Sequence, residues 1–339
     1  MLKITGNYFL GIFLYTLVII LLADFGRILL KYVFHASWIH SRTAFTVAGA
    51  ICALLILLLS ACGIFHAKYI KTTSYDVIIN KTIPERTSMK VVLLADTHFG
   101  YNAGVLHARE LVRKINKQKP DLVCIAGDIF DNEYDAIRNP EKLEKTLRGI
   151  KSTYGVYACW GNHDLNEEIL AGFTFKHKDG DLSDIKDPHM KKFLEDSNIH
   201  ILEDESVLIN DQFYVIGRKD ASLTEKIHET RKAPAQLTEK LNRDKPIIMI
   251  DHQPKELQEL ADAGVDLDLC GHTHNGQTFP GNFTIKLMWE NPCGLLSKDN
   301  MTNITTSGAG VWGPAMRIGT DSEICSINIC LLYTSDAAD

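Results

Sequence analysis

The sequence lacks the short motifs that mark several common classes of hydrolase and nucleotide-binding protein. No GxxxxGK[ST] loop occurs, which argues against a P-loop nucleotidase, and no HExxH helix occurs, which argues against a zinc protease. The absence of a GxSxG elbow argues against an α/β-hydrolase triad. The net charge of −6 supplies no basic footprint for nucleic acid, and no nucleic-acid-binding motif is present.

The eight cysteines contain no CxxC pair, so the sequence indicates neither a thiolate zinc site nor a redox pair. Cys52 and Cys62 lie in an apolar run, whereas Cys124, Cys159 and Cys270 interrupt strand-like stretches. A free cysteine in such places behaves as a small hydrophobic residue. We therefore expect no disulfide framework.

Charge is absent from two long apolar runs, 4–23 and 44–65. At a rise of about 1.5 Å per residue, each run can cross a hydrocarbon core roughly 30 Å thick. The alternative is a signal peptide followed by a buried core helix. However, the first run has no evident small-residue cleavage site, and the second is too long. The sequence thus predicts two transmembrane helices within a membrane anchor over 1–70, followed by a linker over 71–89.

Basic residues lie on both sides of the two runs, with Arg27, Lys31 and Arg42 in the connecting loop and Lys3, Lys68, Lys71 and Lys81 in the flanks. An even number of spans returns the chain to the side of its N-terminus. The positive-inside comparison is nearly balanced and tilts weakly toward a cytoplasmic main domain.

Beyond the linker, strand-like and helix-like patterns alternate. Strands are predicted at 90–96, 121–128, 155–164, 212–217, 246–251, 265–270 and 323–329, and helices at 105–118, 141–151 and 255–263. This alternation predicts an α/β domain over 90–330 with at least partly parallel strand pairing. The polar stretch 173–190 is expected to be a surface insertion, and 331–339 a tail foreign to the fold.

Five of the predicted strands end in carboxylate, amide or imidazole side chains: Asp96 and His98, then Asp128, then Asn162, His163 and Asp164, then Asp251 and His252, then His272 and His274. In an open α/β sheet, the loops beyond the carboxyl ends of the strands form the usual ligand crevice. We therefore expect these side chains to gather at one rim.

Each of these elements has an ordinary structural reading when taken alone. An Asp-x-His sequence is most often a turn or a helix cap, and an isolated Asn162 would be a turn residue. The same chemistry at five successive strand ends is much harder to explain by turns. The combined oxygen and nitrogen donors suit two divalent ions bridged by a carboxylate, an arrangement fitted to in-line displacement at phosphorus.

The segments "DTH", "GD", "GNHD", "DH" and "GHTH", in this order, resemble the calcineurin-like metallophosphoesterase family over 90–329. The stretches "GHTHNGQTFP", "GRKD" and "GVWGPAMRIGTDSE" look like the bacterial membrane-anchored branch of that family. The resemblance implies a metallophosphoesterase-type two-sheet sandwich flanked by helices, preceded by two transmembrane helices. It also implies an integral protein of a bacterial plasma membrane.

Carried over residue by residue, the resemblance implies two metal ions, one held by Asp96, His98, Asp128 and His274 and the other by Asp128, Asn162, His252 and His272. Asp128 would bridge them. The ions would be divalent, with Mn, Zn, Fe and Co all open. His163 matches the family histidine that faces the leaving group, and Asp164 completes its motif and is expected to orient it.

The sequence therefore predicts a metal-dependent phosphoric ester hydrolase, a phosphodiesterase or pyrophosphatase that uses a metal-activated hydroxide. Its expected partners are a phosphoester substrate, lipid-linked or from the cell envelope, and the membrane bilayer. Arg218 and Arg231 are candidate phosphate contacts, although surface arginines are commoner. Two alternatives stay open: a phosphomonoesterase or protein phosphatase, and a non-catalytic metal-binding membrane scaffold. Intact Asp96, Asn162 and His163 weigh against the scaffold.

Overall fold

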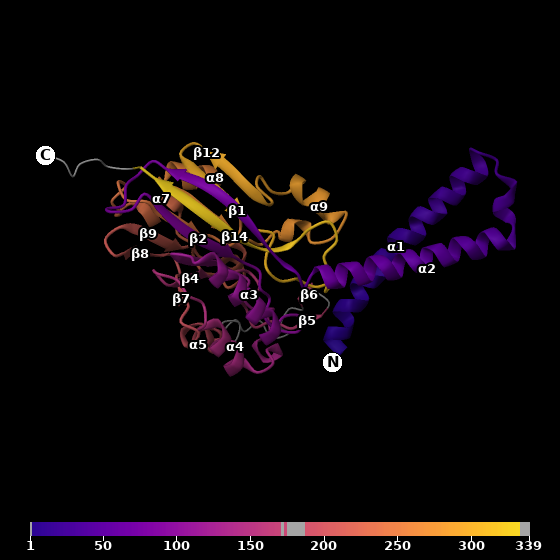
Figure 1. Cartoon of the computed structure of the whole chain (residues 1–339), viewed down its shortest axis with the longest axis horizontal. Coiled ribbons are helices and arrows are strands. Elements are labelled where there is room, and N and C mark those ends of the chain that lie inside the picture. Colours follow the sequence, from indigo (N-terminus) through magenta and orange to yellow (C-terminus); the bar gives the residue numbers. More distant parts are fainter. Residues whose placement is uncertain (1, 171–172, 175–186, 333–339) are drawn as a thin grey trace.

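Two long apolar helices lead the chain in the computed structural model, which describes residues 2–170, 173–174 and 187–332. Helices α1 (Leu2–Tyr32) and α2 (Arg42–His66) are joined through η1 (Ser37–His40) and project from the remainder as a hairpin (Figure 1). Within the described residues, these two helices are long and apolar enough to cross a membrane. Most of their surface is exposed, as expected for helices that face lipid and not for the core helices of a soluble protein.

The remainder is built on two mixed sheets. Among the described residues, the first sheet has the strand order β1 (Ile70–Ile79), β14 (Ser322–Leu331), β2 (Ser88–Leu94), β3 (Leu122–Ala126), β4 (Val156–Cys159) and β7 (His200–Ile201). The second has the order β12 (Gly294–Lys298), β13 (Met301–Thr305), β11 (Leu267–Cys270), β10 (Ile247–Ile250), β9 (Phe213–Gly217) and β8 (Glu205–Ile209). The central strands of both sheets pair in parallel, so their carboxyl ends lie at a common edge.

The sheets pack face to face and helices cover their outer faces. Residues of β2, such as Leu93, share one buried core with residues of β10, such as Ile250. Helices α3 (Val105–Gln118), α4 (Pro140–Leu147) and α5 (Pro188–Asp196) pack on the first sheet. Helices α7 (Pro234–Thr238) and α8 (Leu257–Asp262) pack on the second. The predicted two-sheet sandwich flanked by helices is confirmed.

Shorter elements complete the described chain: η2 (Tyr134–Ala136), the strand pair β5 (Ile169–Leu170) and β6 (Phe173–Thr174), α6 (Ala221–Lys226), η3 (His274–Gly276), α9 (Gly281–Thr284) and η4 (Ile285–Leu287). Most of the expected surface insertion, 175–186, lies outside the described residues, as does the expected tail from 333 onward.

The expected linker over 71–89 differs in the structure. It holds most of β1, which pairs in parallel with β14 along its whole length, from Ile70 opposite Ser322 to Ile79 opposite Leu331. Polar residues in the middle of this strand hide the apolar pattern that would have marked it. As a result, α2 leads almost directly into the first sheet.

Candidate metal centre

Loops that follow five parallel strands meet at the common edge of the two sheets. The loop after β2 is hydrogen-bonded to the loop after β3, because Asp96 N donates to Gly127 O at 3.0 Å. The loop after β11 is bonded to the loop after β10 through Gly271 N, which donates to His252 O at 3.0 Å. The two pairs are joined across the sandwich by His272 N, which donates to the Asp96 carboxylate at 3.0 Å. These bonds place the residues that follow each strand within one small volume.

One donor group consists of Asp96, His98 and His274, all buried. One ligand atom from each lies within 4.8 Å of the others. The Nε2 atoms of His98 and His274 face each other at 3.1 Å, and His274 Nε2 lies 3.9 Å from Asp96 Oδ1. Two imidazole nitrogens and a carboxylate oxygen thus lie close enough to bind one metal ion.

A second group consists of Asp128, His252 and His272. His252 Nε2 lies 3.2 Å from Asp128 Oδ2, 3.0 Å from Asn162 Oδ1 and 3.2 Å from His272 Nδ1. On its far side, His252 Nδ1 donates to the carbonyl of Ala126 at 2.8 Å, so Nε2 is the nitrogen that faces the other donors. Burial would lower the pKa of this ring, but the Asp128 carboxylate raises it well above its ordinary value.

Asp128 lies between the two groups. Its Oδ2 is 3.9 Å from His98 Nε2 in the first group and 3.2 Å from His252 Nε2 in the second. Converging lone pairs from imidazoles and carboxylates repel one another unless a proton or a metal cation lies between them. Mixed nitrogen and oxygen donors of this kind fit Mn²⁺, Zn²⁺, Fe²⁺ or Co²⁺. The chemistry of the donor set therefore fits a pair of divalent ions that share one carboxylate.

Electrostatics at the site follow from burial and mutual proximity. Burial raises the pKa of Asp96 to about 6, against the opposing effect of the His252 ring. Burial would also raise the pKa of Asp128, but the nearby imidazoles of His252 and His163 hold it well below its ordinary value. Burial, reinforced by the charge of His252, lowers the pKa of His272 to about 3. A neutral imidazole is the form that binds a metal, so His272 is already in its ligand state at neutral pH.

The backbone carries strain at these residues. Five of the predicted donors adopt positive φ angles: Asp96 (53°), His98 (44°), Asp128 (49°), His272 (72°) and His274 (48°). Residues other than glycine rarely occupy this left-handed region, and such strain concentrates at functional sites.

Two glycines of the motifs allow the loops to approach each other. A Cβ at Gly161 would lie 2.2 Å from Asp128 Oδ1, and a Cβ at Gly271 would lie 2.8 Å from Asp96 Oδ2 and 2.3 Å from Ala95 Cβ. Any side chain at either position would displace a predicted ligand. These contacts give the glycines of "GNHD" and "GHTH" a physical role.

His163 lies against the donors but differs from them electrostatically. Its Nδ1 is 2.6 Å from Asn132 Oδ1, and its ring centroid is 5.3 Å from that of His98. Burial lowers the pKa of His163 to about 4, against the raising effect of Asp128, so the resting ring is neutral. Because the Asn132 oxygen only accepts, Nδ1 carries the proton and the Nε2 lone pair is free.

Asp164 binds the loop backbone and not the His163 ring. Its carboxylate accepts from Phe130 N at 2.8 Å and from Gly161 N at 2.7 Å. Burial raises the pKa of Asp164 to about 7. The side chain hydrogen-bonded to the His163 ring is Asn132, so an orienting effect of Asp164 on His163 would act through the loop backbone.

Two further residues near the donors were not found by sequence reasoning. The Asp131 carboxylate lies 3.5 Å from His98 Nδ1, the position of an outer partner that orients a ligand imidazole. The buried Arg317 guanidinium donates to the carbonyls of Ser307, Gly310 and His274 at 2.6, 2.8 and 3.3 Å. The signal for Asp131 was its closeness to Asp128. Arg317 belongs to the "GVWGPAMRIGTDSE" stretch, which otherwise appeared only as a family marker.

Arg218 and Arg231, the candidate phosphate contacts, are paired with carboxylates and do not line the cleft over the donors. Both donate to the buried carboxylate of Asp251, at 3.2 and 2.6 Å. Arg218 also pairs with Glu256. Asp251, one of the strand-end carboxylates, is therefore neutralised by arginines and is not among the two donor groups.

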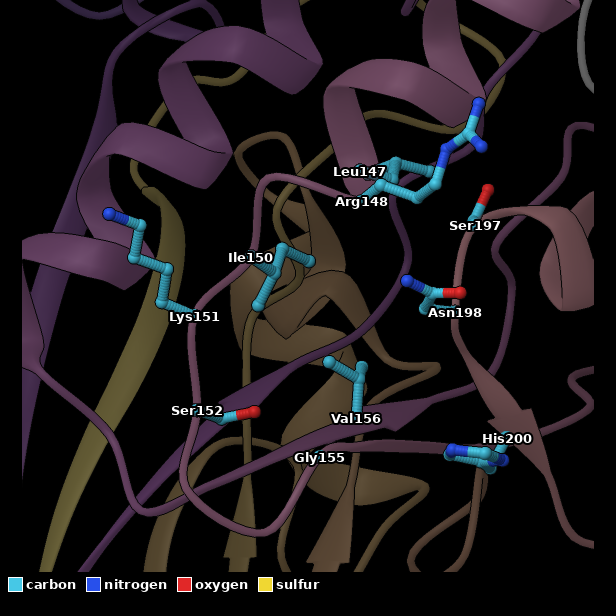
Figure 2. A pocket seen from close by; sticks show the side chains of 10 residues that line it. All are labelled: Leu147, Arg148, Ile150, Lys151, Ser152, Gly155, Val156, Ser197, Asn198 and His200. Atoms are coloured by element: carbon cyan, nitrogen blue, oxygen red, sulfur yellow. The ribbon is translucent and has the colours of Figure 1, made fainter.

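A cleft of about 670 Å³ opens over the donors. Its polar lining includes Asp128, Asn162, His163, His272 and His274, with the rings of Trp289 and Trp312 against His272 and His163; apolar side chains that include Ile285 also line it. A smaller cavity of about 380 Å³ lies at the end of α4 and is lined by Arg148, Asn198 and His200 among others (Figure 2). Neither donor group contributes to that second cavity.

Comparison with known proteins agrees with this geometry. Residues 89–276 match the family model described as "Calcineurin-like phosphoesterase". Because this match covers more than half of the chain, the protein belongs to that family.

Several relatives carry the same family name. The chain is 32% identical over 253 residues to an "Uncharacterized metallophosphoesterase" of Campylobacter jejuni, a match that covers 72% of this chain and 60% of the relative. It is 27% identical to a "Transmembrane protein with metallophosphoesterase domain" of Bos taurus, covering 82% of this chain and 61% of that protein. It is 23% identical to the "UDP-2,3-diacylglucosamine pyrophosphatase" of Chlamydia trachomatis, covering 73% and 86%. The chain spans about three-fifths of the length of the first two relatives. Together with the two apolar helices, the transmembrane relative indicates a membrane protein.

Proposed function

We propose that this chain is a membrane-anchored, dinuclear-metal phosphohydrolase that cleaves phosphodiesters or pyrophosphates. The observation that carries the proposal is the pair of donor groups on either side of Asp128, which open into a cleft beside His163. Residues 1–70 form the anchor and 90–330 the catalytic domain, with β1 as the strand that connects them.

The proposed ligands are those that the resemblance implies. Asp96, His98 and His274 would hold one ion and Asn162, His252 and His272 the other, with Asp128 shared. When bound, two such ions supply a hydroxide near neutral pH and neutralise charge on the phosphoryl oxygens. The identity of the metal stays open among Mn, Zn, Fe and Co.

His163 would act on the leaving group. Its resting ring is neutral because burial lowers its pKa to about 4. An anionic phosphoryl group in the cleft opposes the effect of burial and favours the imidazolium, with the new proton on Nε2 because Nδ1 faces Asn132. That proton then passes to the departing oxygen. General acid catalysis of this type contributes about 10²–10⁴ in rate.

Trp312 is a candidate contact for a phosphoryl oxygen. It lines the cleft, and its ring lies 5.8 Å from that of His163. Within the described residues, its buried indole N–H has no hydrogen-bond partner. A substrate oxygen that accepted a hydrogen bond from this N–H would satisfy a donor that is otherwise costly to bury.

The charge of the cleft favours a diester over a monoester. Among the described residues that line it, none is a lysine or an arginine. A monoester carries up to two negative charges at neutral pH and a diester carries one, so a cleft without fixed cations besides the metals suits the diester better. The pyrophosphatase among the relatives lends support to the same substrate classes. The monoesterase or protein phosphatase is the second candidate.

The test is a substrate comparison with purified full-length protein and Mn²⁺. We expect bis-p-nitrophenyl phosphate to be hydrolysed with a higher kcat/KM than p-nitrophenyl phosphate. A higher kcat/KM for p-nitrophenyl phosphate would instead identify the protein as a phosphomonoesterase. If the protein with two ions bound hydrolysed neither compound and no lipid pyrophosphate, the non-catalytic metal-binding scaffold would be the remaining hypothesis.

We further propose a bacterial plasma membrane as the location, with the catalytic domain on the cytoplasmic side. The basic residues that flank the helices tilt weakly toward this orientation. Protease digestion of intact and inverted membrane vesicles tests it, because a cytoplasmic domain is degraded only in inverted vesicles.

A further inference from the structure

The first apolar helix is part of the wall of the catalytic cleft. Leu10 and Leu14, one turn apart on α1, line the same cleft as Asp128 and His163. Ile285 and Met288, from η4 and its C-terminal end, line the same cleft. One cleft therefore joins the polar side chains of the site to apolar side chains, some of which come from a helix that could span a membrane.

The contact between α1 and the catalytic domain runs along one side of the helix. Asn7, Gly11, Tyr15 and Ile19 are buried at successive intervals of four residues. A Cβ at Gly11 would lie 2.3 Å from Met316 Cε, and Tyr15 Oη donates to Phe279 O at 2.8 Å. The N-terminal half of α1 thus packs on the catalytic domain, and its C-terminal half projects with α2 (Figure 1).

The projecting part of the hairpin begins at contacts that both helices make with the catalytic domain. Helix α2 meets the catalytic domain at Ser60 and Gly63, whose carbonyl accepts from Arg317 N at 3.0 Å. The stretch 42–59 before that contact rises about 27 Å at 1.5 Å per residue, close to the thickness of a hydrocarbon core. On α1, an equal length counted back from Tyr32 ends near Tyr15, and it includes the exposed ion pair of Asp24 with Arg27. The Tyr15–Phe279 hydrogen bond therefore lies where the projecting part of α1 meets the catalytic domain.

Large apolar side chains are exposed next to this contact. On the segment 276–289, Phe279 is 47% exposed, Phe283 60%, Leu287 88% and Met288 74%. Figure 1 shows α9, at the centre of this segment, on the side of the domain from which the hairpin projects. Exposed apolar patches mark interaction surfaces, and this one joins directly to α1 through Tyr15. Its continuity with a helix that faces lipid makes the bilayer its partner.

We propose that the cleft opens into the bilayer surface and takes a membrane lipid, with the phosphate at the metal donors and an alkyl chain along Leu10, Leu14, Ile285 and Met288. This inference rests on the proposed function and names its substrate class. In the reaction, the oxygen of water bonds to phosphorus and the bond from phosphorus to the leaving oxygen breaks. A proton that originates from the water ends on the leaving oxygen, so the products are a phosphate monoester and an alcohol.

Two synthetic diesters separate the inference from the proposed function. Methyl p-nitrophenyl phosphate and dodecyl p-nitrophenyl phosphate have the same charge and leaving group and differ only in the alkyl chain. The full-length protein is assayed in phosphatidylcholine nanodiscs with Mn²⁺, and the readout is the ratio of kcat/KM for the dodecyl ester to that for the methyl ester. This ratio is independent of the fraction of active protein. If several methylenes of the dodecyl chain are buried in the cleft, the ratio of kcat/KM for the dodecyl ester to that for the methyl ester should be at least about 10.

Partition of the dodecyl ester into the bilayer would also raise this ratio, so a matched pair of variants is required. Leu14 and Leu17 are both 42% exposed on α1, but only Leu14 lines the cleft. We expect Leu14→Gln to lower the ratio severalfold and Leu17→Gln to leave it at the wild-type value. Equal ratios in both variants, or equal rates for the two esters in the wild type, would overturn the inference. Hydrolysis of neither ester would overturn the proposed function instead.

Discussion

The backbone N–H of His163 donates a hydrogen bond to Asp128 Oδ1 at 2.8 Å. The predicted leaving-group acid and the predicted shared ligand are therefore hydrogen-bonded to each other. The bond uses the main chain of His163 and leaves its ring free to contact Asn132 and the cleft. Substitution of the His163 side chain therefore removes an acid without removing the support of a ligand.

His163→Ala is accordingly expected to lower kcat by about 10²–10⁴ while the metal content stays near that of the wild type. Asp128→Ala removes the shared carboxylate and is expected to lose metal and activity together. The measurement is metal content by mass spectrometry alongside kcat. Loss of metal in His163→Ala as complete as that in Asp128→Ala would make His163 a structural residue or a ligand.

Gly161→Ala tests the close approach of two loops. The new Cβ would lie 2.2 Å from Asp128 Oδ1, so the carboxylate must move, and we expect metal content and kcat to fall together. Gly104→Ala is the matched control, because its Cβ would meet nothing within 4 Å and its backbone is extended. A Gly161→Ala protein with wild-type metal content would show that the site tolerates displacement of Asp128.

Asp268 is expected to make stability depend on pH. Burial, reinforced by the charge of Asp251, raises the pKa of the Asp268 carboxyl to about 7. Between about pH 4 and pH 7 the folded state retains a proton that the unfolded state has lost, so the free energy of unfolding decreases as pH rises through this window. Asp268→Asn removes this dependence and keeps an acceptor for Asn303, whose Nδ2 lies 2.8 Å from Asp268 Oδ2.

The Tm of Asp268→Asn should therefore exceed that of the wild type by several degrees more at pH 8 than at pH 5, at roughly 2–4 °C per kcal/mol. The exposed Asp262→Asn serves as control and should show no comparable difference. An Asp268→Asn protein whose Tm differs from the wild type equally at both pH values would contradict a raised pKa at Asp268.

The exposed segment 276–289 should control access to substrate in the membrane. In the double variant Phe283→Ser and Leu287→Ser, we expect kcat/KM for the dodecyl diester in nanodiscs to fall about tenfold, in line with the loss of buried apolar surface. Hydrolysis of the methyl diester should be unchanged, because neither residue lines the cleft. Leu208→Ser, which removes another exposed leucine on β8, is the control. Equal losses in the two proteins would indicate a general effect on folding.

The parts of the fold with strong local patterns were predictable from the sequence. Helix α3 occupies 105–118 as predicted, because its apolar stripe is regular and the residue before Pro120 ends it. The gathering of these polar side chains was also predictable, because the carboxyl ends of parallel strands lie at one edge and the residues that follow them meet there.

Contacts between distant segments were not predictable in this way. Strand β1 appeared as a linker because its central residues are polar and its partner β14 lies at the other end of the chain. The contact of α1 with the cleft could not be predicted, because a uniformly apolar run indicates a helix that faces lipid on every side. The buried Asn7 and Tyr15 are the polar signals that distinguish its protein-facing side. Asn132 and Arg317 depend on tertiary packing, which spacing along the chain does not reveal.

The central claim is that two cations share Asp128, and a metal titration tests it most directly. The full-length protein is stripped with a chelator, and Mn²⁺ is added in steps while bound metal and hydrolysis of bis-p-nitrophenyl phosphate are measured together. The account predicts no activity in the stripped protein and full recovery only at two bound ions per chain. Full activity without metal, or with a single bound ion, would contradict it.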